Sequence, residues 1–135
     1  IDGKRIVLID DSIVRGTTSL KIVQMMREAG AKEVHMRIAS PPTRHSCFYG
    51  VDTPERTKLL AHKLDVGGMQ EFIHADSLAF LSIDGLYKAL GEARRADIRP
   101  QYCDACFSGD YPTSLTDQDE AAVKDQLELL SYRVV

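Results

Sequence analysis

Residues 5–19, RIVLIDDSIVRGTTS, are the stretch that decides the fold. Four apolar residues at 6–9 form a short continuous run, which is typical of a strand buried on both faces of a parallel sheet. The run ends at Asp10 and Asp11, two adjacent carboxylates that repel each other, and burial would increase the repulsion. Small and hydroxylated residues follow, so we expect a cation or a hydroxyl-rich ligand beside the acids.

A helix and a second strand are predicted directly after this stretch. Residues 17–29 read as a helix, with an N-cap among the hydroxylated residues 17–19 and Gly30 as the stop. The apolar residues at helical spacing, which are expected to form its buried face, are Ile22, Met25, Met26 and Ala29. Residues 34–38 alternate apolar and other side chains, which predicts a strand with one less buried face. A strand, a helix and a strand in this order indicate a parallel α/β sheet.

The second half of the chain is less regular. Its predicted elements are a helix at 53–64, a break at Gly67-Gly68, a short helix at 69–74, a strand at 78–81 and a helix at 83–90. A polar, basic connector at 92–101 and an acidic, amphipathic tail follow. The cationic residues Lys58, Lys63, Arg94 and Arg95 are expected to be solvated.

Composition and charge exclude several classes of function. With 135 residues, 44% of them hydrophobic, the chain fits one soluble domain. The net charge of −3 argues against non-specific binding to nucleic acid or to anionic membranes, and no apolar run is long enough to span a bilayer. Because no secretory signal is visible, we expect a cytoplasmic protein. The chain opens at Ile1, shortly before a strand of core type, so we expect it to be part of a longer protein.

The loop at 10–18 has the elements of a phosphate site. It follows a predicted parallel strand, where open α/β sheets bind ligands, and it precedes a helix whose first N–H groups attract anions. Gly16 allows close backbone approach, while Ser12, Thr17 and Thr18 offer hydroxyl donors. The acids could accept hydrogen bonds from neighbouring sugar hydroxyls and help to hold hydrated Mg²⁺ on a pyrophosphate. The alternative is an ordinary helix N-cap with surface acids. A phosphorylated ribose fits better, because an N-cap needs only one hydroxylated residue and this loop has several.

Three cysteines form a second candidate site. Cys103 and Cys106 are spaced as Cys-x-x-Cys, and Cys47 lies far upstream. In a chain without an export signal this spacing indicates a metal or redox site more than disulfides. Three cysteines cannot complete a four-cysteine site, so zinc with His45 as a further ligand and an unligated Cys47 stay open as alternatives.

The stretch VLIDDSIVRGTTS resembles the phosphoribosyl pyrophosphate (PRPP) loop of type I phosphoribosyltransferases. Together with IVQMMREAGAKEVHMRIASPPTRHSCFYGVDTP, it is similar to the glutamine PRPP amidotransferases in particular, over nearly all of residues 1–115. The resemblance implies an α/β fold, part of a type I phosphoribosyltransferase fold in which helices flank a parallel sheet. Residues 1–91 would be its second half, 92–113 a connector with the metal-binding cysteines, and 114–135 an acidic helical tail.

The resemblance also implies roles for individual residues. Asp10 and Asp11 would receive the ribose 2′ and 3′ hydroxyls near Mg²⁺. The 5′-phosphate would be held by Ser12, Ile13, Val14, Arg15, Gly16, Thr17 and Thr18. In the iron–sulfur branch of the family, Cys47, Cys103 and Cys106 would ligate a structural, oxygen-sensitive [4Fe–4S] cluster, its fourth cysteine lying upstream of Ile1, with Phe48 and Tyr49 packed around it.

The activity implied by the resemblance is the first step of de novo purine synthesis. An N-terminal domain, not in this chain, would hydrolyse glutamine, and its ammonia would displace pyrophosphate from PRPP to give 5-phosphoribosylamine. This chain would supply no catalytic nucleophile and would be inactive alone, while the full-length enzyme would be a homo-oligomer inhibited by purine nucleotides. A catalytically silent PRPP-sensing regulator and a zinc-ribbon module are the alternatives. A phosphoacceptor receiver domain, a further alternative, also ends its first strand in paired acids but needs another aspartate at the end of a later strand. The second strand here ends instead in Ala39-Ser40-Pro41, which argues against it.

Overall fold

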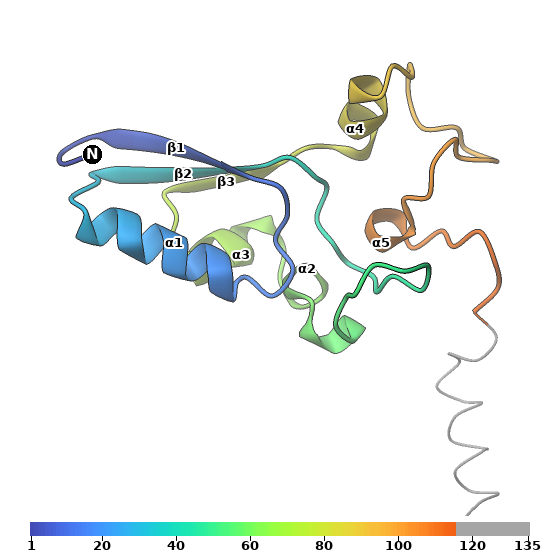
Figure 1. Cartoon of the computed structure of the whole chain (residues 1–135), viewed down its shortest axis with the longest axis horizontal. Helices are drawn as coiled ribbons and strands as arrows, with labels where there is room; N and C mark the ends of the chain where they lie inside the picture. Colours follow the sequence, from blue (N-terminus) through green and yellow to red (C-terminus); the bar gives the residue numbers. More distant parts are fainter. Residues whose placement is uncertain (116–135) are drawn as a thin grey trace, which may run out of the picture.

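Three parallel strands form the centre of the structure, a computed structural model that describes residues 1–115 (Figure 1). They are β1 (Arg5–Asp10), β2 (Glu33–Ile38) and β3 (Ser77–Phe80), in the spatial order β1-β2-β3. Leu8 pairs with Met36 and Met36 with Leu78, so the carboxyl ends of all three strands lie at one edge of the sheet. The predicted α/β class with a parallel sheet is confirmed.

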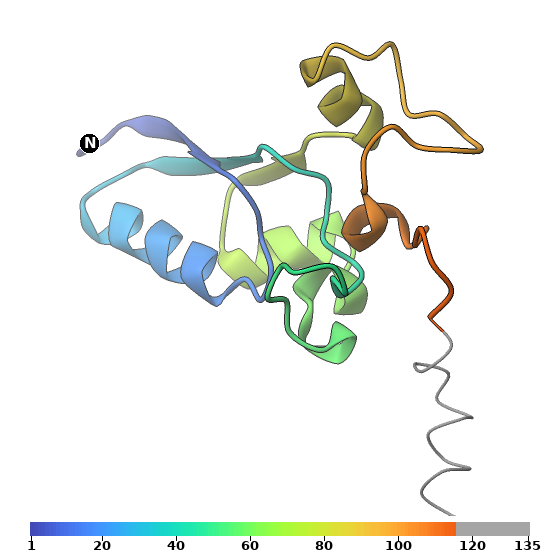
Figure 2. The ribbon, with the colours of Figure 1, turned by 45° about the vertical axis from the view of Figure 1, so that its right-hand side comes forward.

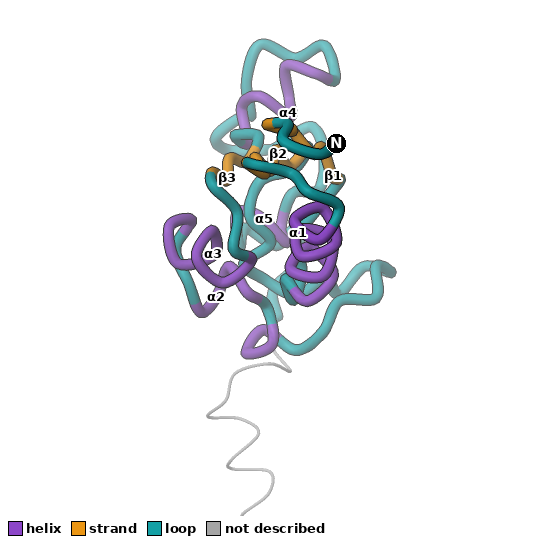
Figure 3. The backbone as a smooth tube through the Cα atoms, turned by 90° about the vertical axis from the view of Figure 1, so that its left-hand side faces the viewer, coloured by secondary structure: helices purple, strands orange, loops and turns teal. Residues whose placement is uncertain are grey.

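Helices cover one face of this sheet, as Figures 1 and 3 show. The two against the sheet are α1 (Thr17–Glu28) and α3 (Val66–Ile73), which also contact each other. The short elements η1 (Arg56–Lys58) and α2 (Leu60–Lys63) continue this layer. Two further helices, α4 (Ile83–Ala89) and α5 (Ala105–Ser108), lie past the carboxyl ends of the strands.

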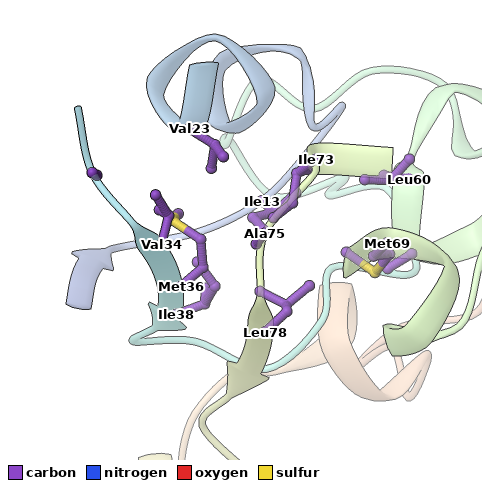
Figure 4. Packing of buried hydrophobic residues seen from close by; sticks show 12 residues of the cluster. Ile13, Val23, Val34, Met36, Ile38, Leu60, Met69, Ile73, Ala75 and Leu78 are labelled. Atoms are coloured by element: carbon purple, nitrogen blue, oxygen red, sulfur yellow. The ribbon is translucent and has the colours of Figure 1, made fainter. Parts of the chain in front are cut away.

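The hydrophobic core lies between the sheet and these helices (Figure 4). β2 contributes Val34, Met36 and Ile38, all of which are buried. Met69 and Ile73 of α3 face them from the helical layer. The alternation read from residues 34–38 therefore identified the strand correctly, because the central strand of a sheet with one covered face must send alternate side chains into that core.

The prediction that β1 is buried on both faces is wrong for the described residues. Val7 is 61% exposed and Ile9 is 80% exposed, while Ile6 and Leu8 on the opposite face pack against the core. β1 is an edge strand here, and the helical layer covers only one of its faces. β2, predicted to have the less buried face, is the more buried strand because it lies in the centre.

The helix predicted after the loop is present, but its buried face and its cap differ from the prediction. Of the four residues predicted to face the core, Met26 packs against it and Ile22 is half-buried, whereas Met25 is 58% exposed and Ala29 lies at the surface. Ser19 and Val23 are the buried residues of the helix. The N-cap is Gly16, and no side chain caps the helix. α1 packs against both α3 and β2, and the spacing of apolar residues within the helix does not show where these neighbours lie.

The second half of the chain corrects two further predictions. The helix expected at 53–64 is divided into η1 and α2, since Leu59 is extended and the Leu60 N–H donates to the Val14 carbonyl at 2.8 Å. The break expected at Gly67-Gly68 is instead the first turn of α3, which Asp65 caps by accepting from the Gly68 N–H at 2.8 Å. β3 and α4 occur within one residue of their predicted bounds.

The predicted acidic tail at 114–135 lies almost entirely outside the described residues. Within residues 1–115, no helix has both the length and the apolar character that a membrane span requires. The proposed division at residues 91 and 113 stays a prediction.

Candidate functional site

The loop at 10–18 leaves the carboxyl end of β1 and enters α1, as predicted (Figure 1). Two backbone hydrogen bonds fix it in place. The Ala39 N–H donates to the Asp10 carbonyl at 2.9 Å, which ties the base of the loop to the end of β2. The Leu60 N–H donates to the Val14 carbonyl, which ties the middle of the loop to α2. The loop is therefore held by the fold on both sides.

A run of consecutive backbone N–H groups in this loop has no protein acceptor. Within residues 1–115, none of the N–H groups of residues 12–19 donates to a protein atom. The Asp11 N–H before the run donates to Asp10 Oδ1 at 3.0 Å, and the Leu20 N–H after it donates to the Gly16 carbonyl at 2.9 Å. Backbone donors in a folded protein are normally paired, and a helix N-terminus adds positive potential. The loop is thus arranged to bind an anion.

Gly16 is required at its position for two independent reasons. Its φ is 78°, in the left-handed region that side chains with a Cβ rarely adopt. A Cβ there would also lie 2.5 Å from Leu60 Cδ2 and 2.9 Å from Phe72 Cε1. Ile13 is the other buried residue of the loop, and its side chain belongs to the core. Ile13 and Gly16 can therefore offer a ligand only their backbone.

The two acids at the start of the loop have no cationic partner among residues 1–115. Asp10 is half-buried and Asp11 is exposed. Within residues 1–115, the only polar contacts of their carboxylates are the Asp11 N–H, which donates to Asp10, and the Ser12 hydroxyl, which donates to Asp11 Oδ1 at 3.4 Å. Both carboxylates can therefore accept further hydrogen bonds or bind a cation. Thr17 and Thr18 are exposed and can donate beside them.

A cavity of about 400 Å³ adjoins the loop. Its floor is formed by Leu60, Leu64 and Phe72, and its cationic residues are Arg15, Lys58 and Lys63. This grouping could not be predicted from local pattern, because the lysines lie more than forty positions after Arg15 and were expected to be solvated. The structure therefore places cationic side chains beside the anion-binding loop, although Lys58 also pairs with Glu55 at 3.3 Å.

The cysteines lie on two segments that pack against each other beyond the sheet (Figure 2). The N–H groups of Arg44 and His45 both donate to the Cys106 carbonyl at 3.0 Å. The Tyr111 hydroxyl donates to the Ser46 carbonyl at 2.6 Å, and the ring of Tyr111 lies 5.4 Å from that of Phe48. Cys47 is therefore brought to the region of Cys106, although the two are far apart in sequence.

The three thiols are free, with Cys47 and Cys106 half-buried and Cys103 exposed. Burial raises the pKa of the Cys106 thiol, and the neighbouring Cys47 and Cys103 raise it further. Among residues 1–115, no group of three His, Cys, Asp or Glu side chains is already arranged to hold a metal ion. The donor chemistry suits a soft metal centre, since three thiols lie in one region of the fold.

Sequence reasoning missed a buried carboxylate inside the Cys-x-x-Cys motif. Asp104 is 2% exposed and forms a salt bridge with Arg95, which was expected to be solvated. Burial by itself would raise the pKa of Asp104, but hydrogen bonds from Arg95, Ser108 and Tyr87 hold that pKa below its usual value. The carboxylate is therefore charged at neutral pH. No local pattern in the sequence distinguishes it from an exposed acid.

Comparisons with known proteins identify relatives of this chain. No model of a known protein family matches the chain. It is 58% identical over 132 residues to an amidophosphoribosyltransferase of Rhizobium etli, which covers 97% of this chain and 27% of that protein. It is also 58% identical over 117 residues to the chloroplastic amidophosphoribosyltransferase 1 of Arabidopsis thaliana, covering 87% of this chain and 20% of that protein.

A solved structure shares the fold. The glutamine PRPP amidotransferase of Bacillus subtilis, complexed with ADP and GMP, matches with a TM-score of 0.77 and 51% identity. The match covers 85% of this chain and 25% of that chain. The chain thus spans about a quarter of the length of the relatives it matches. This sequence identity and this shared fold show that the chain belongs to the amidophosphoribosyltransferase family.

Proposed function

We propose that this chain forms the PRPP-binding part of an amidophosphoribosyltransferase. The whole enzyme would make 5-phosphoribosylamine from PRPP and ammonia released from glutamine, the first step of purine synthesis. The observation that carries the proposal is the run of N–H groups at 12–19 that have no acceptor within residues 1–115, placed beside two carboxylates that have no cationic partner there. Membership of the family supports the same reading.

The loop would hold PRPP at two points. The amides of residues 12–18, with the hydroxyls of Thr17 and Thr18, would bind the 5′-phosphate. Asp10 and Asp11 would accept hydrogen bonds from the 2′ and 3′ hydroxyls of the ribose and would help to hold Mg²⁺. When bound, Mg²⁺ neutralises charge on the pyrophosphate. A sugar fixed by its phosphate and its hydroxyls has its C1 in a defined orientation, and such orientation lowers the barrier to displacement.

The test is a PRPP titration in the presence of Mg²⁺ on the intact protein, meaning this chain together with the remaining domains of its family. Asp10→Asn combined with Asp11→Asn should weaken binding by about tenfold or more, because hydrogen bonds to charged groups contribute roughly 1.5–3 kcal/mol. Asp52→Asn, an exposed acid outside the loop, is the matched control and should leave affinity unchanged. Equal affinity in the double variant and the control would refute the sugar-hydroxyl role.

Turnover separates the enzyme from the silent regulator. The intact protein should form phosphoribosylamine from PRPP with either glutamine or ammonia. PRPP binding without any product would identify a regulator instead. Residues 1–135 alone should form no product even with ammonia, since the chain spans about a quarter of the length of its relatives and would hold only the ribose and 5′-phosphate part of the proposed site. Product formation by the isolated chain would contradict this.

We also propose that Cys47, Cys103 and Cys106 supply three ligands of a [4Fe–4S] cluster whose fourth ligand lies elsewhere. Two observations support it: three free thiols, and hydrogen bonds that join the segment of Cys47 to the carbonyl of Cys106. When bound, such a cluster would crosslink the two segments. Iron and acid-labile sulfide should both be found in anaerobically prepared intact protein. Zinc without sulfide would favour the zinc alternative.

The family also suggests how the protein is regulated, how it assembles and where it is located. The Bacillus subtilis relative was solved with ADP and GMP, and we propose that purine nucleotides also inhibit this protein. We further propose a homo-oligomer in the cytoplasm, without nucleic-acid or membrane partners. Some plant relatives are named as chloroplastic, so imaging of the tagged intact protein is the direct test of location.

A further inference from the structure

Asp104 lies between Cys103 and Cys106, and its buried side chain is surrounded by hydrogen-bond donors. It accepts from Arg95 Nε at 2.5 Å and from Arg95 Nη2 at 3.2 Å. The Tyr87 hydroxyl donates to Asp104 at 2.9 Å and the Ser108 hydroxyl at 2.8 Å. An ionised carboxylate is costly to bury unless it is paired and hydrogen-bonded. Both conditions are met here.

The donors come from three separate parts of the chain. Tyr87 lies in α4 and is almost completely buried, Arg95 lies in the connector, and Ser108 lies in α5. Two further bonds extend the network: Tyr87 donates to the Tyr102 carbonyl at 3.1 Å, and Arg95 donates to Asp110 at 2.7 Å. The network therefore fastens the chain immediately before Cys103 and immediately after α5. Figure 2 shows how long the loop is that joins α4 to α5.

The backbone on either side of a fixed side chain is also restrained. Asp104 is the N-cap residue of α5, its carbonyl accepts from Phe107 and Ser108, and the Cys106 carbonyl accepts from Arg44 and His45. Without Asp104 and Arg95, the exposed Cys103 would have no comparable restraint among the described residues. A loop of this length without an anchor would sample many conformations before its thiols were aligned.

We propose that Asp104 is a positioning residue for Cys103 and Cys106. Held by Arg95 and by Tyr87 of α4, it restrains the backbone that carries the two thiols, and it slows the loss of a metal centre bound to them. The inference rests on the proposed iron–sulfur cluster. Mutation of a residue that orients metal ligands without binding the metal itself typically lowers metal affinity by about 10- to 100-fold.

The experiment measures how fast iron leaves the intact, anaerobically prepared protein in excess chelator, followed by the visible absorbance of the cluster. Asp104→Asn and Arg95→Ala should each accelerate the loss about 10- to 100-fold. Arg94→Ala and Asp97→Asn are matched controls, because Arg94 and Asp97 form an exposed ion pair in the same connector. Both controls should lose iron at the wild-type rate. Thermal unfolding of each variant is recorded in parallel.

The outcomes separate this inference from the cluster proposal. A wild-type protein without iron and sulfide overturns both. A cluster-containing wild type, with Asp104→Asn losing iron at the wild-type rate well below its unfolding temperature, overturns the positioning role alone. If Asp104→Asn does not accumulate as folded protein, Tyr87→Phe decides. It keeps the buried ring and removes one donor to Asp104, so faster iron loss supports the role and an unchanged rate overturns it.

Discussion

The loop at 10–18, proposed to bind phosphate, and the cysteine region (residues 44–49 and 103–113) are built in different ways. The loop is continuous in sequence, and its binding groups are mostly backbone amides that the start of a helix aligns. The cysteine region joins segments about sixty residues apart through side-chain hydrogen bonds and aromatic contacts. A site made of local backbone can be read from one stretch of sequence. A site made of distant side chains depends on contacts that only the folded chain brings together.

The largest expected effect concerns the cysteine region and its ion pair. Arg95→Ala should lower the free energy of unfolding of the intact protein by about 3 kcal/mol, because it leaves the buried Asp104 carboxylate without its cation. Arg94→Ala removes only an exposed pair and should change stability by less than about 1 kcal/mol. Denaturant unfolding of the two variants checks this. Equal stabilities would mean that the cysteine region does not depend on the network.

The next effect concerns the loop at 10–18. Gly16→Ala should lower stability by about 2 kcal/mol, since it places a Cβ in left-handed backbone and against Leu60. PRPP affinity should fall as well, because the amides of residues 12–19 can no longer keep their alignment. Gly50→Ala is the control: its φ is also positive, at 113°, but a Cβ there would meet nothing within 4 Å. If both alanine variants bind PRPP equally well, close packing of the loop is not needed for binding.

The smallest expected effect concerns Asp76, which lies beside the sheet and contacts Arg27 and the Val34 N–H. The pKa of Asp76 is lowered below its usual value, mainly by the hydrogen bond from the Val34 N–H and also by the Arg27 guanidinium. Partial burial acts in the opposite direction but is outweighed. A carboxylate with a lowered pKa stabilises the fold fully above its unfolded value of about 3.9, and this contribution disappears as pH falls through the folded value. Asp76→Asn should therefore cost less than about 1 kcal/mol at neutral pH, since Asp76 is about one-third exposed.

Urea unfolding at several pH values checks the sign of this effect. The difference between wild type and Asp76→Asn should shrink as the pH falls below the unfolded value, because the wild-type carboxylate is then protonated in both states. Asp52→Asn, which removes an exposed acid, should show no such trend. A difference that grows in acid would contradict the pairing of Asp76 with Arg27 and Val34.

Several elements could be predicted from local pattern, and the errors have a common cause. The β1-loop-α1-β2 unit, β3 and α4 were placed correctly because their hydrophobic runs and stop signals are local. The continuous helix at 53–64 and the burial of β1 on both faces were wrong, and the buried face of α1 was only partly right, since each depends on a neighbour distant in sequence. Leu60 is the clearest case, because its N–H bonds to Val14 instead of continuing a helix.

The amino-acid sequence alone determined the parallel α/β class and the position of the loop at 10–18, with its two acids and its glycine, between β1 and α1. These features follow from short-range preferences of the backbone and from the spacing of apolar residues, which neighbouring residues largely decide. The tertiary structure alone decided that Asp104 and Arg95 are buried partners, that Cys47 lies beside the segment of Cys106, and that Arg15 shares a cavity with two lysines. Burial and pairing between residues far apart in sequence are set by how the elements pack, and no local pattern encodes that packing.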